Sequence, residues 1–249
     1  MANQPDLTIV IPARREEKRV GKTLDKLATF LNKDPMISRK EVEVLVVAVD
    51  AGDATQEVVL SKKGQFKNLR LLKPGKPVGK GRDVKYGMLR AKGRAVLFMD
   101  ADLATPLKYI PKAYKEFEAG NDVVIATRNL RKHHASVLRR LLSNTGNMLF
   151  RIASGVWVED SQCGFKLFSR EASKICFSKL TIMGWGFDME ALAIARANKL
   201  TLKTIRVNDW ESVPGGIFES GFVSNALSSL KELAYIFRNR VKRSYVHKS

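Results

Sequence analysis

The sequence predicts an α/β fold in which a mostly parallel β-sheet is flanked by helices on both faces. Short apolar runs rich in β-branched residues alternate with amphipathic stretches of helical period, which is typical of parallel sheets. The 249 residues include 45% hydrophobic side chains, enough for a full-sized core without disulfides or a structural metal. No linker rich in Pro, Gly or Ser divides the chain. We therefore expect one domain, or one domain with a small appendage.

The first half of the chain alternates strictly between strands and helices. Strands are predicted where apolar and β-branched residues cluster, at residues 7–12, 43–49, 68–72, 95–100 and 122–126. Helices are predicted where apolar residues recur at helical spacing, at residues 18–31, 54–62, 82–91 and 106–119, the last opened by a proline. Ligands of such folds collect outside the carboxyl ends of the strands. The residues that follow each strand are therefore the candidates for a site.

The second half is less regular. It predicts a long helix at about 135–154, an extended piece at 163–168, a helix near 187–198, a strand at 202–207 and a final helix at about 222–241. The apolar residues of the final helix are Val223, Ala226, Leu227, Leu230, Ala234, Phe237 and Val241, and its basic end holds Arg238, Arg240, Lys242 and Arg243. The apolar face either docks on the domain's own core, as most such faces do, or contacts an anionic membrane surface.

The net charge of +19 is concentrated in three segments. Residues 62–94 hold twelve Lys and Arg against one acidic residue, residues 128–140 hold five against none, and residues 231–249 hold six against one. One such cluster alone is usually a solvated face that keeps a protein soluble. Three clusters on an otherwise neutral body indicate separate anionic partners.

Several classes of protein are excluded by composition. The longest apolar runs, at residues 44–49 and 95–99, are far shorter than the roughly 20 residues that cross a bilayer. The N-terminus lacks the pattern of a signal peptide. Cys163 and Cys176 form neither a disulfide framework nor a metal-ligand spacing, so a reducing cytoplasm is the simplest location.

The strongest local signal is an apolar strand that ends in Asp100-Ala101-Asp102. Two carboxylates separated by one residue are often only a solvated turn. At the tip of a buried strand they can hold Mg²⁺ or Mn²⁺, because these ions accept one or two carboxylates together with phosphate oxygens of a substrate. We favour the metal site.

A loop rich in Gly and Lys, residues 74–83, runs into the helix before that strand. It matches neither a Walker A loop nor a dinucleotide fingerprint, since Gly81 and Val84 occupy positions that those motifs reserve for other residues. With Lys80 and Arg82 it can still cradle an anion at the helix N-terminus. The alternative is an ordinary solvated hairpin.

Polar residues also follow the first two strands. Pro12, Arg14 and Glu16 stand at the first, and Asp50 and Asp53 at the second. A carboxylate at the mouth of a parallel sheet can accept hydrogen bonds from a nucleobase or ribose. Either segment could instead cap a helix, with Asp53 as the N-cap of the helix at 54–62.

Taken together, these segments resemble glycosyltransferase family 2, the inverting sugar-nucleotide enzymes of the GT-A fold, and most closely its dolichyl-phosphate glucosyltransferase branch. The resemblance runs over residues 8–213. It is carried by IVIPARREEKRV, GKGRDVKYGMLRAKGRAVLFMDADLAT, DSQCGFKLFSREA, GWGFDMEAL and VNDWESV, in the family's order. The segment after the second strand departs from the family, because Asp50-Ala-Gly-Asp53 replaces Asp-Asp-Gly-Ser. The resemblance therefore does not specify which nucleobase the donor carries.

The resemblance implies a GT-A-type, Rossmann-like catalytic domain at residues 1–220 and a basic amphipathic helix at 221–249. It implies that Asp100 and Asp102 hold the metal. The donor-binding residues it implies are Pro12, Arg14, Glu16, Asp50, Lys80, Arg82, Asp100, Ala101 and Asp102. The acceptor-binding residues it implies are Arg128, Arg139, Ser143, Gln162, Trp185 and Asp188. The catalytic residues it implies are Asp102, Arg128 and Asp160.

The implied reaction moves a sugar from a nucleotide sugar to a polyprenyl or dolichyl phosphate at the cytoplasmic face of a membrane. Glucose is the first expectation for the sugar, and UDP-glucose is the first expectation for the donor. An acceptor phosphate is already ionised at neutral pH, so Asp160 is expected to orient it and not to deprotonate it. The alternatives are GDP-mannose as the donor, a soluble acceptor that needs Asp160 as a base, an inactive relative, and a nucleic-acid-binding protein. No aromatic stacking ladder or recognition helix supports the last of these.

Overall fold

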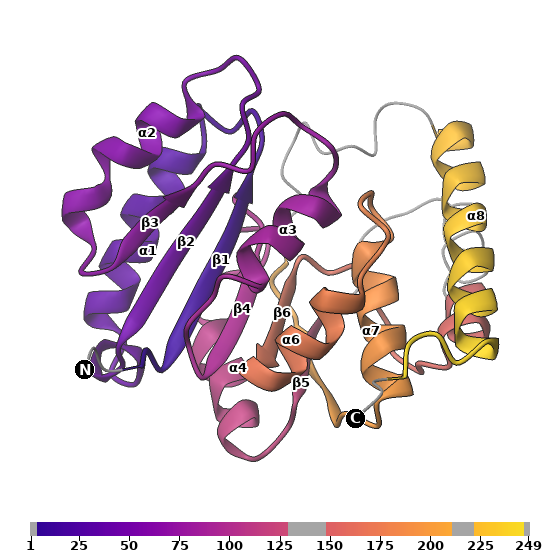
Figure 1. Ribbon diagram of the computed structural model, residues 1–249. Helices are drawn as coiled ribbons and strands as arrows, with labels where there is room; N and C mark the ends of the chain where they lie inside the picture. The colour runs from indigo at the N-terminus through magenta and orange to yellow at the C-terminus, as the bar shows by residue number, and fades with distance from the viewer. Residues whose placement is uncertain (1–3, 129–147, 211–221, 247–249) are drawn as a thin grey trace.

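The computed structural model describes residues 4–128, 148–210 and 222–246, with side chains from residue 229 onward in the last range. It contains a seven-stranded sheet in the order β3-β2-β1-β4-β6-β5-β7 (Figure 1). The strands are β1 (Leu7–Ala13), β2 (Val42–Ala48), β3 (Leu69–Leu72), β4 (Ala95–Met99), β5 (Val123–Arg128), β6 (Phe165–Ser169) and β7 (Leu202–Val207). Only β6 runs antiparallel to its neighbours. The expectation of a mostly parallel sheet is confirmed.

Helices cover both faces of this sheet. They are α1 (Val20–Lys33), α2 (Thr55–Ser61), α3 (Lys80–Met88), α4 (Tyr109–Glu118), α6 (Arg170–Lys179), α7 (Phe187–Ala197) and α8 (Phe222–Val241), with short 3-10 turns η1 (Ile37–Arg39) and η2 (Lys63–Gln65). Side chains alternate along β1, so that Ile9 and Ile11 join a core with α1, α2 and α4, while Val10 joins a second core with α3, α6, α7 and α8. The sheet is therefore buried on both faces.

Two features of the second half differ from the sequence prediction. The extended piece at 163–168 enters the sheet as β6, between β4 and β5, with Leu167 paired to both Leu97 and Val124. Helix α6 was not predicted. It follows β6 directly, and the side chain of Ser169 caps it by accepting the N–H of Ala172 at 3.1 Å. This Ser N-cap is the signal that sequence reasoning missed.

Several helix boundaries also differ from those predicted from the sequence. Helix α4 begins at Tyr109 and not at the proline of residue 106, and α3 begins at Lys80 and not at residue 82. Asp53 does not cap α2. The N-cap position is Ala54, whose N–H is bound by Glu17 Oε2 at 3.0 Å. Of the helix expected at 135–154, residues 148–154 are helical, and the rest, with Arg139 and Ser143, lies outside the described residues.

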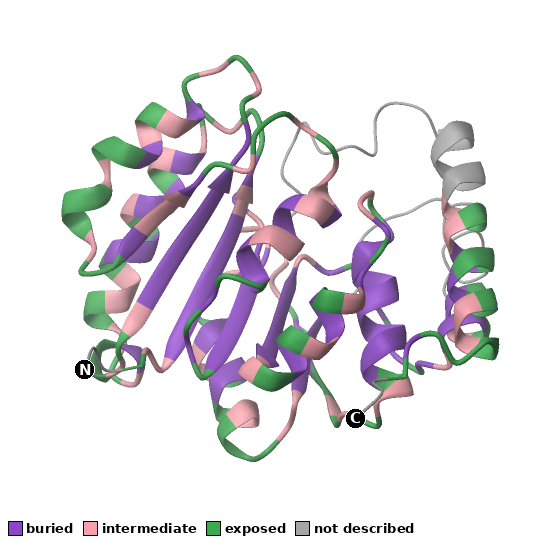
Figure 2. Cartoon of the chain, viewed as in Figure 1, coloured by how far each residue is buried: buried purple, intermediate pink, exposed green. Residues whose placement is uncertain are grey.

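Helix α8 has the expected bounds, but the large apolar residues of the stripe whose side chains are described do not dock on the core. In the described part of the helix, Leu230, Phe237 and Val241 are 49%, 45% and 62% exposed. Leu233 and Ile236, on a neighbouring face, are the residues buried in the core that α7 also joins. Figure 2 shows the resulting division of α8 into exposed and buried sides. The interpretation that the stripe docks on the domain's own core is wrong for these residues. No helix in the described ranges is both long and apolar enough to cross a membrane.

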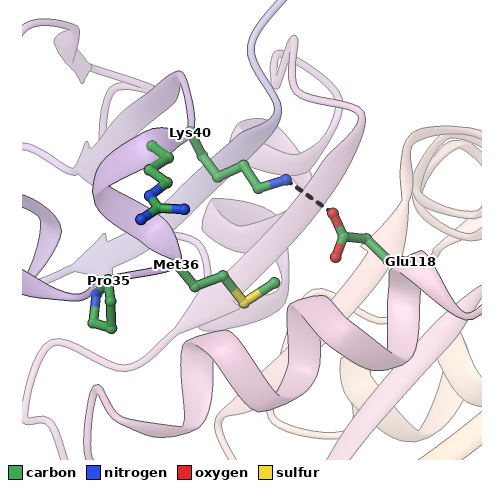
Figure 3. A pocket seen from close by; sticks show the side chains of 5 residues that line it. Pro35, Met36, Lys40 and Glu118 are labelled. Atoms are coloured by element: carbon green, nitrogen blue, oxygen red, sulfur yellow. Dashed lines mark hydrogen bonds and ion pairs between the residues drawn. The ribbon is translucent and has the colours of Figure 1, made fainter.

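A surface pocket of about 490 Å³ lies between η1 and the end of α4 (Figure 3). Lys40 and Glu118 face each other across it in a 2.9 Å ion pair. Lys40 precedes β2 and Glu118 precedes β5, so the pocket is at the amino ends of the strands. It is therefore remote from the edge at which ligands of parallel sheets bind.

Candidate active site

The carboxyl ends of β1, β2, β4 and β5 share one edge of the sheet, because these four strands point the same way. Arg14 and Glu16 follow β1, Asp50 follows β2, Asp100 follows β4, and Arg128 is the last residue of β5. Residues that are distant in sequence are thus brought to one place by the strand order.

Two carboxylates stand at the end of β4, on either side of Ala101. Ala101 is buried, and its carbonyl oxygen accepts a 2.5 Å hydrogen bond from Thr23 Oγ1 of α1. Asp102 Oδ1 accepts the N–H of Ala104 at 3.0 Å. Asp100 Oδ1 is buried and lies 2.6 Å from Lys80 Nζ as an ion pair, without a hydrogen bond of good geometry. Both carboxylates therefore keep oxygen lone pairs available to a further ligand.

Lys80 joins the carboxylates from the first turn of α3. Its ammonium group lies 5.0 Å from the centre of the Trp185 ring, which is 51% exposed. Burial acts to lower the pKa of Lys80, but the charges of Asp100, Asp188 and Asp102 outweigh burial and raise that pKa. Lys80 is therefore held as a cation beside the carboxylates.

Arg82 and the helix N-terminus do not form the expected anion cradle. The guanidinium of Arg82 donates to the carbonyl oxygens of Pro74 and Lys76 at 2.7 and 2.6 Å and to Asp83 at 2.8 Å. The N–H groups of Gly81 and Arg82 both point to the carbonyl oxygen of Met183, at 2.9 and 3.3 Å. These groups hold the loop in place, and Lys80 alone of this segment faces the carboxylates.

A buried ion pair closes the other side of the site. Arg128 Nε and Nη2 donate to the two oxygens of Asp160 at 2.6 and 2.9 Å, in a bidentate arrangement. Asp160 also accepts the backbone N–H groups of Arg128 and Gln162, at 3.2 and 3.1 Å. The guanidinium of Arg128 lies 5.0 Å from the ring centre of Trp210. Asp160 is therefore fully engaged in holding Arg128.

Electrostatics keep this pair ionised. Burial acts to raise the pKa of Asp160, but the hydrogen bonds and charge of Arg128 outweigh burial and leave the pKa below its usual value. The pKa of Arg128 is raised in turn, because Asp160 outweighs the effect of burial. A carboxylate with a lowered pKa is a weak base, and this one accepts hydrogen bonds from the guanidinium of Arg128 through both oxygens.

Asp188 is not at the surface of the site. It is 4% exposed, its Oδ2 lies 3.1 Å from Nζ of the fully buried Lys166, and its Oδ1 accepts the N–H of Met189. Burial raises its pKa, and the charge of Lys166 opposes the rise. The structure thus does not support a direct ligand contact for Asp188. Gln162 is exposed beside the Arg128 pair.

The residues after β1 approach the carboxylates from a third side. Burial raises the pKa of Glu16, Arg19 opposes the rise, and the charges of Asp100 and Asp102 add to it. Arg14 and Asp50 are exposed, and Pro12 is half-buried in β1. The backbone N–H of Asp50 bonds to the carbonyl of Gly75, which ties this strand end to the loop before α3.

Three contributors to the site were missed by sequence reasoning. Trp210 lies beside Arg128, Lys166 neutralises Asp188, and Gly164 contacts Asp100. A Cβ on Gly164 would lie 1.9 Å from Asp100 Oδ2, so only glycine admits the carboxylate there. The glycine inside DSQCGFK was the available signal, but only the pairing of β6 with β4 brings it to Asp100.

Comparison with known proteins agrees with this geometry. Residues 8–176, more than half of the chain, match the family model described as Glycosyl transferase family 2. The chain belongs to glycosyltransferase family 2. The resemblance seen in the sequence motifs is thereby confirmed, and the chain is a glycosyltransferase.

Relatives of this family 2 enzyme are similar over most of the chain. The dolichyl-phosphate beta-glucosyltransferase ALG5D of Trichomonas vaginalis is 31% identical over 243 residues, which cover 93% of this chain and 74% of that protein. The dolichyl-phosphate beta-glucosyltransferases of Drosophila melanogaster and Homo sapiens are each 33% identical, over 84% of this chain and 68% of theirs.

Solved structures share the fold of this family 2 enzyme. Glucosyl-3-phosphoglycerate synthase of Mycobacterium tuberculosis, in complex with UDP, has a TM-score of 0.66 at 17% identity, covering 98% of this chain and 82% of its own. A mannosyltransferase of Pyrobaculum calidifontis, in complex with GDP-Man and Mn²⁺, has a TM-score of 0.65 at 19% identity, covering 97% and 65%. The GT-A fold is confirmed.

Proposed function

We propose that this enzyme transfers glucose from UDP-glucose to a dolichyl or other polyprenyl phosphate, with inversion at the anomeric carbon. Its similarity to dolichyl-phosphate beta-glucosyltransferases supports the sugar and the acceptor. The observation that carries the proposal is the placement of Asp100, Asp102 and Lys80 at the sheet edge, beside the buried pair of Arg128 and Asp160. The two carboxylates and Lys80 suit the binding of a nucleoside diphosphate, and the pair of Arg128 and Asp160 suits the binding of a phosphate acceptor.

A divalent cation, Mg²⁺ or Mn²⁺, fits the two carboxylates at the end of β4. Asp100 Oδ1 lies 2.6 Å from Lys80 Nζ, so a metal ion would share this carboxylate with the ammonium group. No group of three or more His, Cys, Asp or Glu side chains suited to a metal occurs in the described residues. A pair of carboxylates suits an ion that takes its remaining ligands from water and from a diphosphate. When bound, the ion supplies charge neutralisation to the leaving diphosphate.

The other donor contacts are assigned by position. Lys80, kept cationic by Asp100, lies where its ammonium group can approach a diphosphate. Asp50, Pro12, Arg14 and Glu16 flank the ends of β1 and β2, where the nucleoside of a parallel-sheet ligand binds. Ala101 holds the two carboxylates apart through its bond to α1.

On the acceptor side, Arg128 binds the phosphate of the lipid, and Asp160 orients Arg128. An ionised phosphate oxygen is already a nucleophile, so no proton need be removed before it attacks. Gln162 and the exposed ring of Trp185 line this side. Arg139 and Ser143, outside the described residues, complete the proposed acceptor contacts.

The C-terminal helix supplies a peripheral membrane contact. Of thirteen exposed large hydrophobic side chains in the described residues, ten lie after residue 147, four of them at Met148, Leu149, Ile152 and Trp157. Arg240 of α8 donates to the carbonyl oxygen of Ile152 at 2.9 Å, which places helix 148–154 beside α8. Apolar side chains next to basic ones match an anionic bilayer surface. Both cysteines are free, as in a cytoplasmic location at that surface.

The transfer assay tests the proposal. Purified enzyme, UDP-glucose, Mn²⁺ and a polyprenyl phosphate should yield a lipid-linked glucose detected by mass spectrometry, with inverted configuration. GDP-mannose and a soluble phosphoglycerate acceptor should give much lower rates. If UDP-glucose binds, as read by a shift in melting temperature, but no lipid product forms, the acceptor assignment is wrong.

Substitution of Gly164 by alanine should weaken donor binding. The added Cβ would displace the Asp100 carboxylate from its position, since the two would be 1.9 Å apart. We expect binding of UDP with Mn²⁺ to weaken about 10–100-fold, as is usual when the surroundings of a metal ligand are disturbed. Calorimetric titration of the two proteins with UDP in the presence of Mn²⁺ measures this affinity. Gly64→Ala, in η2 with open space around it and an ordinary backbone conformation, is the control, and equal affinities would contradict the role of Gly164.

Replacing Leu230, Phe237 and Val241 together by asparagine should abolish membrane association. Each exposed apolar side chain contributes about 1.5–3 kcal/mol when it enters an apolar phase. We expect sedimentation with vesicles of anionic phospholipid to fall more than tenfold, while binding of UDP with Mn²⁺ is retained. The control is Leu60→Asn, an equally exposed leucine on α2. Vesicle binding that survives the triple substitution would place the contact elsewhere.

A further inference from the structure

The segment 181–186 between α6 and α7 is clamped between α3 and α8. On the α3 side, the carbonyl oxygen of Met183 accepts the N–H groups of Gly81 and Arg82. Only glycine fits at residues 79 and 81, because a Cβ at these positions would lie 2.3 Å from Met183 O and 2.6 Å from Ile182 O. The segment is therefore in direct backbone contact with the turn of α3 that carries Lys80.

On the α8 side, the same segment meets a single carboxylate. Glu232 is half-buried, and its carboxylate lies against the backbone of Gly186. A Cβ on Gly186 would lie 2.5 Å from Glu232 Oε2, and one on Gly184 would lie 3.0 Å from Oε1. Both carboxylate oxygens thus lie against the glycines that flank Trp185.

The start of the segment is held independently of Glu232. The buried Glu190 accepts the N–H groups of Thr181 and Ile182 at 2.8 and 2.7 Å and the hydroxyl of Tyr245 at 3.0 Å. Because Glu190 secures this end, loss of Glu232 alone should leave the segment attached and the chain folded. Glu232 meets the other end of the segment, at the two glycines on either side of Trp185.

We infer that Glu232 is a positioning residue for the donor site, through which α8 holds Trp185 over Lys80. The inference rests on the proposed function, since Lys80 is assigned there to the donor diphosphate. Three contacts connect α8 to the donor site. Glu232 of α8 lies against Gly186, and the ring of the adjacent Trp185 lies 5.0 Å from Lys80 Nζ. Lys80 in turn pairs with Asp100 at 2.6 Å. The helix that meets the membrane and the donor site are thereby joined by one side chain.

The test compares Glu232→Ala and Glu232→Gln with the wild type in solution. We expect Glu232→Ala to weaken binding of UDP-glucose with Mn²⁺ about tenfold and to raise the KM for the donor. The melting temperature of the ligand-free protein should change little, because Glu190 holds the start of the segment independently. Glu232→Gln should restore most of the affinity, because glutamine has the same shape and keeps the contact with Gly184 and Gly186. Glu159→Ala, at an exposed ion pair with Arg206, is the control.

A spectroscopic measurement separates positioning from general destabilisation. In a variant with Trp157 and Trp210 replaced by phenylalanine, Trp185 is the sole tryptophan. Glu232→Ala in that background should make its fluorescence easier to quench with acrylamide. Unchanged quenching and unchanged donor affinity in Glu232→Ala would overturn the inference. Failure of the wild type to bind UDP-glucose would instead overturn the proposed function.

Discussion

Substitution of Asp102 by alanine is expected to lower the rate of sugar transfer roughly a thousandfold, the equivalent of about 4 kcal/mol of transition-state stabilisation. Asp102 is one of two carboxylates at the end of β4, and the described residues offer no third ligand group to replace it. Without it, the proposed cation would be held by Asp100 alone. The initial rate with saturating UDP-glucose and Mn²⁺ measures the effect.

A binding measurement shows whether the metal is responsible. In the wild type, Mn²⁺ should increase the rise in melting temperature that UDP produces, and Asp102→Ala should remove this increase. Asp25→Asn on α1, where the carboxylate pairs with Lys62 away from the sheet edge, should behave as the wild type does. A transfer rate in Asp102→Ala within a few-fold of the wild type would show that the metal does not sit there.

Substitution of Arg128 by methionine is expected to lower both stability and activity. It leaves the Asp160 carboxylate, 4% exposed, without its counter-charge. Breaking a buried ion pair in this way typically costs about 3–5 kcal/mol of unfolding free energy. We expect a loss of that size at pH 7, measured by urea unfolding followed by circular dichroism, and a large loss of lipid product in the transfer assay.

The pH dependence identifies the cause of this loss. In the wild type the pKa of Asp160 is lowered on folding, so its contribution is complete above the unfolded value near 3.9 and is lost only as the pH falls further, through the folded pKa. In Arg128→Met, burial is no longer opposed by Arg128, so the carboxyl accepts a proton more readily. The gap in stability between the two proteins should therefore narrow as the pH falls from 7 toward 4. A gap that stays constant would mean that lost packing, not charge, is responsible.

The lowered pKa of Asp160 also leads to a prediction about the mechanism. If Asp160 orients Arg128 and accepts no proton, the transfer rate should show no loss between pH 7 and pH 5 that is due to Asp160. A base of ordinary or raised pKa, as a hydroxyl acceptor needs, would lose activity on approaching its pKa. Asp160→Asn should also lose stability, because it leaves the buried guanidinium of Arg128 without its counter-charge.

Local pattern was sufficient for much of the architecture. The strand at 202–207 and the helix at 222–241 have the predicted bounds, because period-2 and period-3.6 spacing of apolar side chains is a local property of the chain. The carboxylate pair after β4 was also visible, since its signal is a motif at a strand end. The helix α6 and the cap at Ala54 were missed because single hydrogen bonds decide them.

Contacts between distant segments were decided by the tertiary structure alone. By itself the sequence determined the alternation of strands and helices and the set of charged residues that follow the strands. It did not determine that β6 runs antiparallel between β4 and β5, or that Asp188 is buried against Lys166. Nor did it determine that Leu230, Phe237 and Val241 of α8 face outward. Each of these depends on which surface a segment meets after the whole chain has packed. Periodicity specifies that an apolar face exists, but only the shape and charge of its neighbours select the face that is buried.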